Sequence, residues 1–177
     1  KQNLYINEYM KSSNVSVLIA NTKEQETLMK LNLDAKKYIV VSTGKDVDNI
    51  EIVSQILTIN KNVNIYVQIE NRSLRYFHKE NGLLQGSNIK IYSYYEDASR
   101  ELFKKYDIDG KNYEILSRNE EYSIVILGNT NLSYEVIFQA CIMGQLPNEN
   151  KLTIYCLDKN PKKFQKKVEL NYTEINS

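Results

Sequence analysis

Short runs of apolar, often β-branched residues recur along the chain and alternate with stretches of helical spacing. Each run has the length of a strand, and several are apolar at successive positions, as strands buried on both faces are. The six runs are Val15–Ala20, Tyr38–Ser42, Val63–Ile69, Ile89–Tyr92, Ser123–Leu127 and Leu152–Leu157. Because alternating strands and helices are typical of βαβ units, the pattern predicts an α/β protein with a Rossmann-like, mostly parallel sheet of about six strands flanked by helices.

Apolar side chains three or four positions apart predict the helices between these strands. The clearest stripe contains Ile50, Val53, Ile56 and Leu57. Other stripes begin at Glu24, Leu74, Ala98 and Val136, and Pro161–Val168 predicts a last helix with a lysine-rich face.

Polar residues near these stripes predict where the helices begin and end. We expect Asp48 or Asn49 to cap the helix that starts near residue 50, and Asp97 to cap the helix that starts near residue 98. We expect Asn60–Asn62 and Asn81-Gly82 to end two other helical stretches.

The segment Asp107–Glu121 differs from its surroundings because it is polar and has no long apolar run. It predicts a connector (107–121) between an N-terminal portion (1–106) and a C-terminal β-α-β portion (122–177). The C-terminal portion either completes the same sheet or begins a second domain.

Composition narrows the classes of function. The formal net charge is +1, so no strong overall field recruits nucleic acid. Cys141 and Cys156 lie in apolar runs, and the sequence has neither a disulfide framework nor a Cys/His metal pattern, which favours a reducing, cytoplasmic compartment. No apolar run reaches the ~20 residues of a membrane span. Because the chain begins at Lys1, we expect it to be a piece of a longer protein, so it can equally be the soluble part of a membrane protein.

The strongest candidate for ligand binding follows the run Ser123–Leu127. That run ends in Gly128 and passes through Asn129 directly into a helical stretch, where unpaired N–H groups favour a phosphate. The dinucleotide fingerprint asks for three glycines, but Thr130 and Ser133 take the other two places. Asp158 follows the next strand, 25 positions after Ser133, near the ~20 expected of an acid that contacts ribose. The competing interpretation is a strand-to-helix turn without a ligand.

Two further turns lie at strand ends, the edge where ligands bind in open α/β sheets. Thr43 and Gly44 can approach a ligand, and Asp46 or Asp48 can meet a ribose or a cation. At the next turn, Arg72 either holds a phosphate or is a solvated residue of a first helical turn.

The segment Thr43–Ile50 resembles the "TG-x-D-x-x-N" turn of TrkA-N/RCK domains, which are cytoplasmic regulators of potassium channels and transporters. Ser123–Ser133 and Leu157–Pro161 are similar to the family's opening glycine motif and its acidic strand end, with glycines replaced. The resemblance implies NAD or another adenine nucleotide as ligand, a homo-oligomer, and a membrane channel or transporter as partner.

The order of the pieces departs from the family, because residues 1–106 resemble the second half of such a domain and residues 122–177 resemble the first. Three arrangements would complete the sheet: pairing within this chain, exchange with a second copy, or upstream sequence. We favour upstream sequence of a tandem-domain parent, with the C-terminal β-α-β filling the gap in this chain.

The pattern therefore predicts a regulatory nucleotide-sensing domain of an ion-transport system that binds its ligand without turnover. The alternatives are an NAD(P)-dependent oxidoreductase fragment and a vestigial Rossmann-like scaffold for protein interactions. The sequence has no P-loop, nucleophile elbow or metal-binding set, which favours the sensor over the enzyme. The single histidine, His78, has the spacing of a packing residue beside Leu74 and Phe77.

Overall fold

Helices and parallel strands alternate through the computed structural model. It describes residues 16, 18, 20–82, 84–86, 88–106, 122–144 and 152–171. The predicted α/β class is confirmed, although five strands rather than about six are present within these residues. The first predicted strand, Val15–Ala20, lies largely outside them, as does the connector Asp107–Glu121.

The observed elements follow the predicted apolar runs closely. The strands are β1 (Tyr38–Val41), β2 (Asn64–Gln68), β3 (Ile89–Tyr92), β4 (Tyr122–Leu127) and β5 (Leu152–Leu157). The helices are α2 (Gln25–Lys30), α3 (Asp46–Ile59), α4 (Arg72–Asn81), α5 (Tyr94–Lys105), α6 (Asn131–Met143) and α7 (Pro161–Asn171), and η1 (Leu33–Ala35) is a short 3-10 turn. None of the described helices is both long and apolar enough to cross a membrane.

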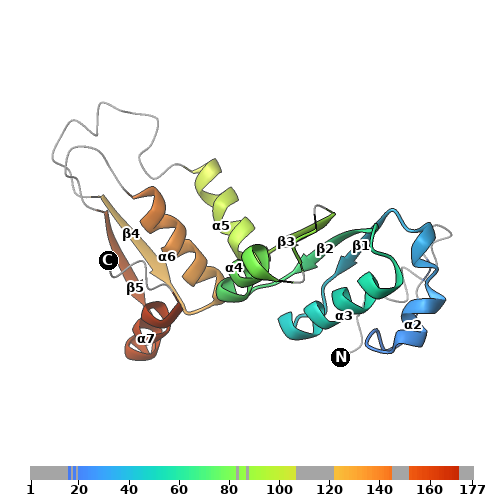
Figure 1. Ribbon diagram of the computed structural model, residues 1–177. Helices are drawn as coiled ribbons and strands as arrows, with labels where there is room; N and C mark the ends of the chain where they lie inside the picture. Colours follow the sequence, from blue (N-terminus) through green and yellow to red (C-terminus); the bar gives the residue numbers. More distant parts are fainter. Residues whose placement is uncertain are drawn as a thin grey trace.

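The described strands form two separate parallel sheets. In the first, β2 lies between β1 and β3, with Ile65 opposite both Ile39 and Ile89. In the second, β4 pairs with β5 along its whole length, and Ile126 lies opposite Cys156. Figure 1 shows α5 and α6 side by side between the two sheets. The packing of these two helices joins the β1–β3 unit to the β4–β5 unit.

The core of the first unit forms where α3 packs on the three-stranded sheet. Val53 and Ile56 of α3 are buried together with Ile65, Val67 and Ile69 of the central strand region. These side chains recur every three or four positions in the helix and every second position in the strand. The apolar face of each element therefore meets the other, and each fully buried aliphatic side chain contributes about 1.5–3 kcal/mol.

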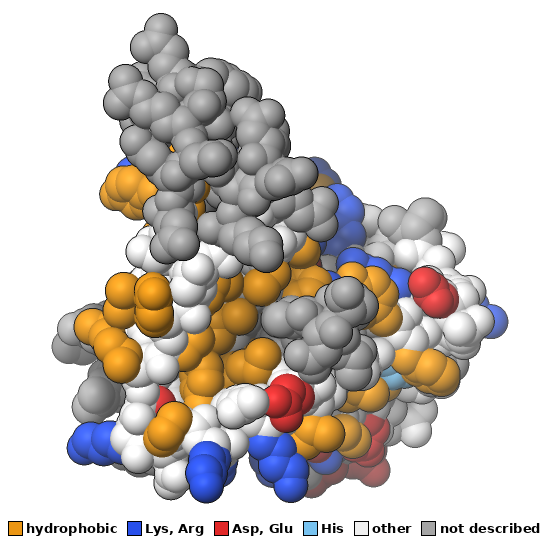
Figure 2. All heavy atoms as spheres, turned by 90° about the vertical axis from the view of Figure 1, so that its left-hand side faces the viewer, with side chains coloured by type: hydrophobic (Ala, Val, Ile, Leu, Met, Phe, Trp, Pro, Cys, Tyr) orange, Lys and Arg blue, Asp and Glu red, His pale blue; other side chains and the backbone are white. Residues whose placement is uncertain are grey.

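The core of the second unit covers only one face of the β4–β5 sheet. Ile126 packs there against Tyr134, Ile137 and Phe138 of α6 and Phe164 of α7. On the other face, four large apolar side chains are exposed: Val125, Leu127, Tyr155 and Leu157. Figure 2, viewed from the end that carries this sheet, shows hydrophobic side chains gathered there. Among the described residues, this sheet is therefore packed against helices on one face only. Its strands are apolar on both faces, a pattern that predicts packing on both.

The expected helix starts were wrong, whereas the expected ends are confirmed. α3 begins at Asp46 after Lys45, so neither Asp48 nor Asn49 is its N-cap. α5 begins at Tyr94, and its cap is Ser93, whose hydroxyl accepts the Glu96 N–H, rather than Asp97. Both helices begin one polar turn before their apolar stripe, so the stripe alone places the start too late. Asn60 and Gly82 are C-caps, as expected.

Candidate functional site

Asp46 joins two of the turns at the carboxyl ends of the first sheet. Its carboxylate accepts the backbone N–H of Glu70 at 2.9 Å and that of Asn71 at 2.7 Å. Both N–H groups belong to the turn between β2 and α4, whereas Asp46 lies in the first turn of α3. The predicted ribose- or cation-binding acid therefore already stabilises the neighbouring turn, and it does so with both oxygens.

Asn49 holds the turn that precedes Asp46. The residue is 1% exposed, and its Oδ1 accepts the N–H of Thr43 at 2.8 Å and the hydroxyl of Thr43 at 2.7 Å. Its Nδ2 donates to the carbonyl oxygen of Gln68 at 2.8 Å. The hydroxyl of Thr43 is thus directed at Asn49, and the turn continues through Gly44, whose φ of +83° lies in the left-handed region.

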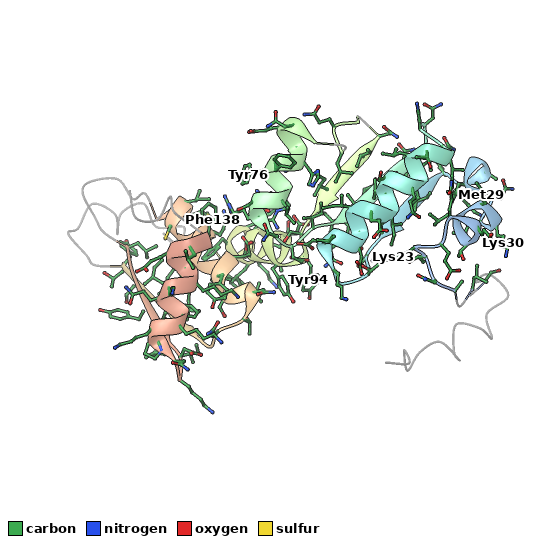
Figure 3. The ribbon with its side chains drawn as sticks, turned by 60° about the horizontal axis from the view of Figure 1, so that its bottom comes forward. Lys23, Met29, Lys30, Tyr76, Tyr94 and Phe138 are labelled. Carbon is green, nitrogen blue, oxygen red and sulfur yellow. The ribbon has the colours of Figure 1, made fainter. Side chains whose placement is uncertain are left out.

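Two other acids at this edge also have partners in the protein. Glu70 accepts the N–H of Tyr94 at 3.0 Å and the hydroxyl of Ser93 at 2.8 Å, so it binds the turn that starts α5. Asp48 pairs with Lys23 at 2.6 Å, and this hydrogen bond lowers the pKa of the Asp48 carboxyl. Lys23 reaches α3 from the segment before α2 (Figure 3).

Two adjoining cavities lie where these turns approach α6 and α7. One has a volume of about 270 Å³, and its lining includes Asp46, Arg72, Tyr134, Glu135 and Lys167. The other, of about 510 Å³, also contains Asp46 and adds Gly44. Tyr95 and Asn131 line both cavities. The N-terminal turn of α6 thus meets the strand ends of the first sheet.

The predicted phosphate-binding hydroxyls of the β4–α6 turn bind to their own helix. Thr130 is the N-cap of α6, and its hydroxyl accepts the Ser133 N–H at 3.2 Å. The hydroxyl of Ser133 accepts the Thr130 N–H at 3.2 Å in return, and the two hydroxyls are 3.0 Å apart. This reciprocal capping box satisfies N–H groups that a phosphate would otherwise contact.

The remaining residues predicted around that turn have structural partners too. Gly128 has a φ of +101°, and its N–H donates to Leu157 at 2.9 Å, which extends the β4–β5 ladder. Asn129 accepts a hydrogen bond from the hydroxyl of Tyr134. Asp158 accepts the N–H of Asn160 at 2.7 Å in the turn before α7. Burial, and secondly the Asp158 carboxylate, raises the pKa of Tyr134.

The structure therefore brings only part of the predicted set together. Asp46 and Arg72 line the first cavity, and Gly44, Asp46 and Asp48 line the second. Asn131, the first residue of α6, lines both. The other predicted ligand residues are not among the described lining residues: Thr43, Gly128, Asn129, Thr130, Ser133 and Asp158.

Arg72 and Glu135 line the first cavity, and the sequence did not indicate that they would meet. Arg72 is not a solvated residue, because its side chain is 13% exposed and lies over the ring of Phe138 at 3.4 Å. Figure 3 shows Phe138 and Tyr76, the second ring over which Arg72 lies, at the junction of α6 and α4. An acid within the otherwise apolar stripe of α6 was the available signal for Glu135.

Arg75 connects three helices through buried ion pairs. Its guanidinium lies 2.7 Å from Glu96 of α5 and 3.4 Å from Glu135 of α6, and its side chain is 4% exposed. It also donates to the carbonyl oxygens of Ile69 and Glu70 at the end of β2, at 3.0 and 2.6 Å. Buried charges require such partners because an unpaired one is costly.

The groups that most often carry catalysis are packing residues here. His78 is buried with its ring against Phe77, in agreement with its helical spacing. Burial raises the pKa of both Cys141 and Cys156, which lowers the fraction of reactive thiolate. The described residues contain no group of three His, Cys, Asp or Glu side chains that could hold a metal ion.

One family model matches part of the chain. Residues 3–85 match the family model of the TrkA-N domain, a span that includes the Thr43–Ile50 turn, α3 and the Asp46 contacts. The match confirms the resemblance seen in that turn, and the segment 122–177 lies outside it. No curated protein and no solved structure matches the chain.

Proposed function

Because residues 3–85 match the family model of the TrkA-N domain, we propose that this chain is a regulatory nucleotide-sensing domain of a potassium or other ion-transport system. In this proposal it binds NAD or another adenine nucleotide without turnover. It acts in the cytoplasm, as a homo-oligomer, on a membrane channel or transporter in the parent protein or complex.

The observation that carries the proposal is the pair of adjoining cavities at the carboxyl ends of the parallel strands. Ligands of open α/β sheets bind at this edge, and cavities of ~300–1,000 Å³ accept small organic ligands. The volumes of about 270 and 510 Å³ adjoin at Asp46, Tyr95 and Asn131. An extended ligand such as a nucleotide can therefore span both.

The lining supplies groups for each part of a nucleotide. Lys167 and Arg72 provide positive charge for phosphates, and the first turn of α4 adds its positive dipole end through Ser73. Tyr95 presents an aromatic side chain for a base. Asp46 already accepts two backbone N–H groups, but a carboxylate has about four acceptor positions, so it can also accept a ribose hydroxyl.

Titration calorimetry with NAD, NADH, ATP and ADP tests the proposal, and Lys167→Ala is the informative variant. Lys167 lines the first cavity, whereas Lys166, its exposed neighbour in the same helix, does not. Loss of one charge-assisted contact weakens binding about tenfold, so we expect that loss with Lys167→Ala and unchanged affinity with Lys166→Ala. Absence of binding by all four nucleotides at millimolar concentration would refute the proposal.

One observation favours the scaffold alternative as second candidate. The reciprocal capping box of Thr130 and Ser133 occupies the turn where a dinucleotide pyrophosphate would dock. In a scaffold, the cavity would be inherited but empty, and the same calorimetry would return no binding. A smaller nucleotide held by Lys167 and Arg72 needs no contact with that turn, which keeps the sensor as the first choice.

A further inference from the structure

A carboxylate of the chain itself already lies between two arginines beside the first cavity. Glu135 is 3.4 Å from Arg75 and 4.0 Å from Arg72, measured between the nearest side-chain oxygen and nitrogen atoms. The Glu135 side chain is 6% exposed. Water therefore contributes little to the stability of its charge, and the two arginines must hold it. The position between the two arginines therefore suits an oxyanion.

The contact between Glu135 and the arginines is long for a charge-assisted hydrogen bond, which is usually ~2.7–2.9 Å. The same arginine, Arg75, shows the difference directly, because its contact with Glu96 is 2.7 Å. Glu96 is thus the tight partner of Arg75, and Glu135 is the loose one. Arg72 lies 4.0 Å from Glu135, donates to the hydroxyl of Tyr76 at 3.1 Å and stacks on Phe138.

The cavity opens onto this loose pair. Arg72 and Glu135 both line the cavity, and Lys167 of α7 lines it as well. A phosphate that enters has more charge than a carboxylate and three strong acceptor oxygens, and it matches the planar fork of an arginine. A phosphate should therefore bind Arg72 more strongly than the Glu135 carboxylate does.

We propose that Glu135 is an internal competitor for the phosphate group of a ligand in this cavity, and that its displacement loosens α6 from α4. The proposal rests on the cavity assigned above to the nucleotide. Glu135 belongs to α6, and its arginine partners belong to α4, so the exchange of partners changes a contact between the two units. Ligand binding is thereby coupled to the α5–α6 junction.

Pyrophosphate binding by the full chain tests the competition, with Glu135→Gln as the variant. Glutamine keeps the shape of the side chain but not its charge, so we expect pyrophosphate to bind about tenfold more tightly. The matched control is Glu96→Gln, because Glu96 also pairs with Arg75 but is not among the described residues that line the cavity. We expect a much smaller change there. A thermal melt of each variant establishes that it is folded.

Hydrogen exchange provides a second readout that a purely structural role would not produce. In the wild-type chain, saturating pyrophosphate should speed exchange of the α6 amides, although a bound ligand ordinarily slows exchange. Unchanged or weaker pyrophosphate binding by a folded Glu135→Gln variant would overturn the inference. Slower α6 exchange on binding would overturn the coupling.

The two proposals fail separately. If pyrophosphate binds more tightly to Glu135→Gln while no nucleotide binds either protein, the competitor inference stands and the nucleotide function falls. If nucleotides bind the wild-type chain and Glu135→Gln leaves both affinities unchanged, the function stands and the competitor inference falls. If pyrophosphate binds neither protein at millimolar concentration, the competitor inference is refuted whatever the nucleotides do.

Discussion

Replacement of Asn49 by alanine tests how the turn between β1 and α3 is held. The substitution removes three hydrogen bonds at once: two from Thr43 to Oδ1 and one from Nδ2 to Gln68. Because Asn49 is 1% exposed, water replaces these bonds only after the turn has moved. The Thr43 N–H and the Gln68 carbonyl oxygen are then left without this partner.

The magnitude follows from those two backbone groups. Each polar group that loses its partner in a buried position costs about 1–3 kcal/mol, whereas the exposed hydroxyl of Thr43 can turn to water at little cost. The expected loss is therefore roughly 2–6 kcal/mol in the free energy of unfolding. At about 2–4 °C per kcal/mol for a chain of this size, the melting temperature should fall by at least several degrees.

Urea denaturation followed by far-ultraviolet circular dichroism measures this loss. Asn62→Ala is the control, because Asn62 is exposed and its hydrogen bond to Asn60 is made by the backbone N–H, which alanine keeps. Asn49→Asp is a second variant, which keeps the acceptor for Thr43 but places a carboxylate against the carbonyl oxygen of Gln68. We expect it to be at least as destabilising as alanine. A loss below about 0.5 kcal/mol for Asn49→Ala, within the range of ordinary surface substitutions, would refute the reasoning.

Three other properties are open to direct measurement. Because Tyr134 has a raised pKa in the folded protein, its contribution to stability should be lost as the pH rises above 10. Alkaline denaturation of Tyr134→Phe should therefore be less steep than that of the control Tyr155→Phe. An added Cβ at Gly128 meets open space, but the turn requires a left-handed φ there, so Gly128→Ala should lower the free energy of unfolding by about 1–2 kcal/mol. Gly128→Asn should lower it less, because asparagine adopts this conformation more readily. Similar losses for both variants would contradict a backbone origin. Cys141 and Cys156 should react slowly with a disulfide reagent at pH 8 and quickly in urea, and equal rates would show that burial does not protect them.

The apolar pattern of the sequence was sufficient to predict the strands and helices. Runs such as Leu152–Leu157 are apolar, β-branched and of strand length, and the structure places strands there. The order in which the strands pair was harder to predict from the sequence, because similar apolar runs do not indicate which strand edges pair. The single sheet of about six strands is replaced by two sheets in the described residues, and the division at 107–121 stays a prediction.

The candidate site was harder to predict, for a definite physical reason. Thr130 and Ser133 suit a phosphate because they carry hydroxyls at a helix start, but the same property suits a capping box, and the sequence does not distinguish the two. Arg75 and Glu135 are 60 positions apart, so their pairing depends on tertiary packing of α4 on α6. The residue types at the β1–α3 turn, through Gly44 and Asp46, and Arg72 at the next turn were the signals that led to the cavities.

The separation of the two sheets has a consequence for cooperativity. Each sheet has its own apolar cluster, and no strand pairing crosses between them in the described part of the chain. Among the described residues, the two units are joined by the packing of α5 on α6, the stacking of Arg72 on Phe138 and the ion pairs of Glu135. Unfolding is then divided into two transitions whenever that junction is weakened, and one melting temperature no longer describes the chain. With the junction weakened, loss of the Asn49 bonds would lower the first unit's transition and leave the β4–β5 unit folded.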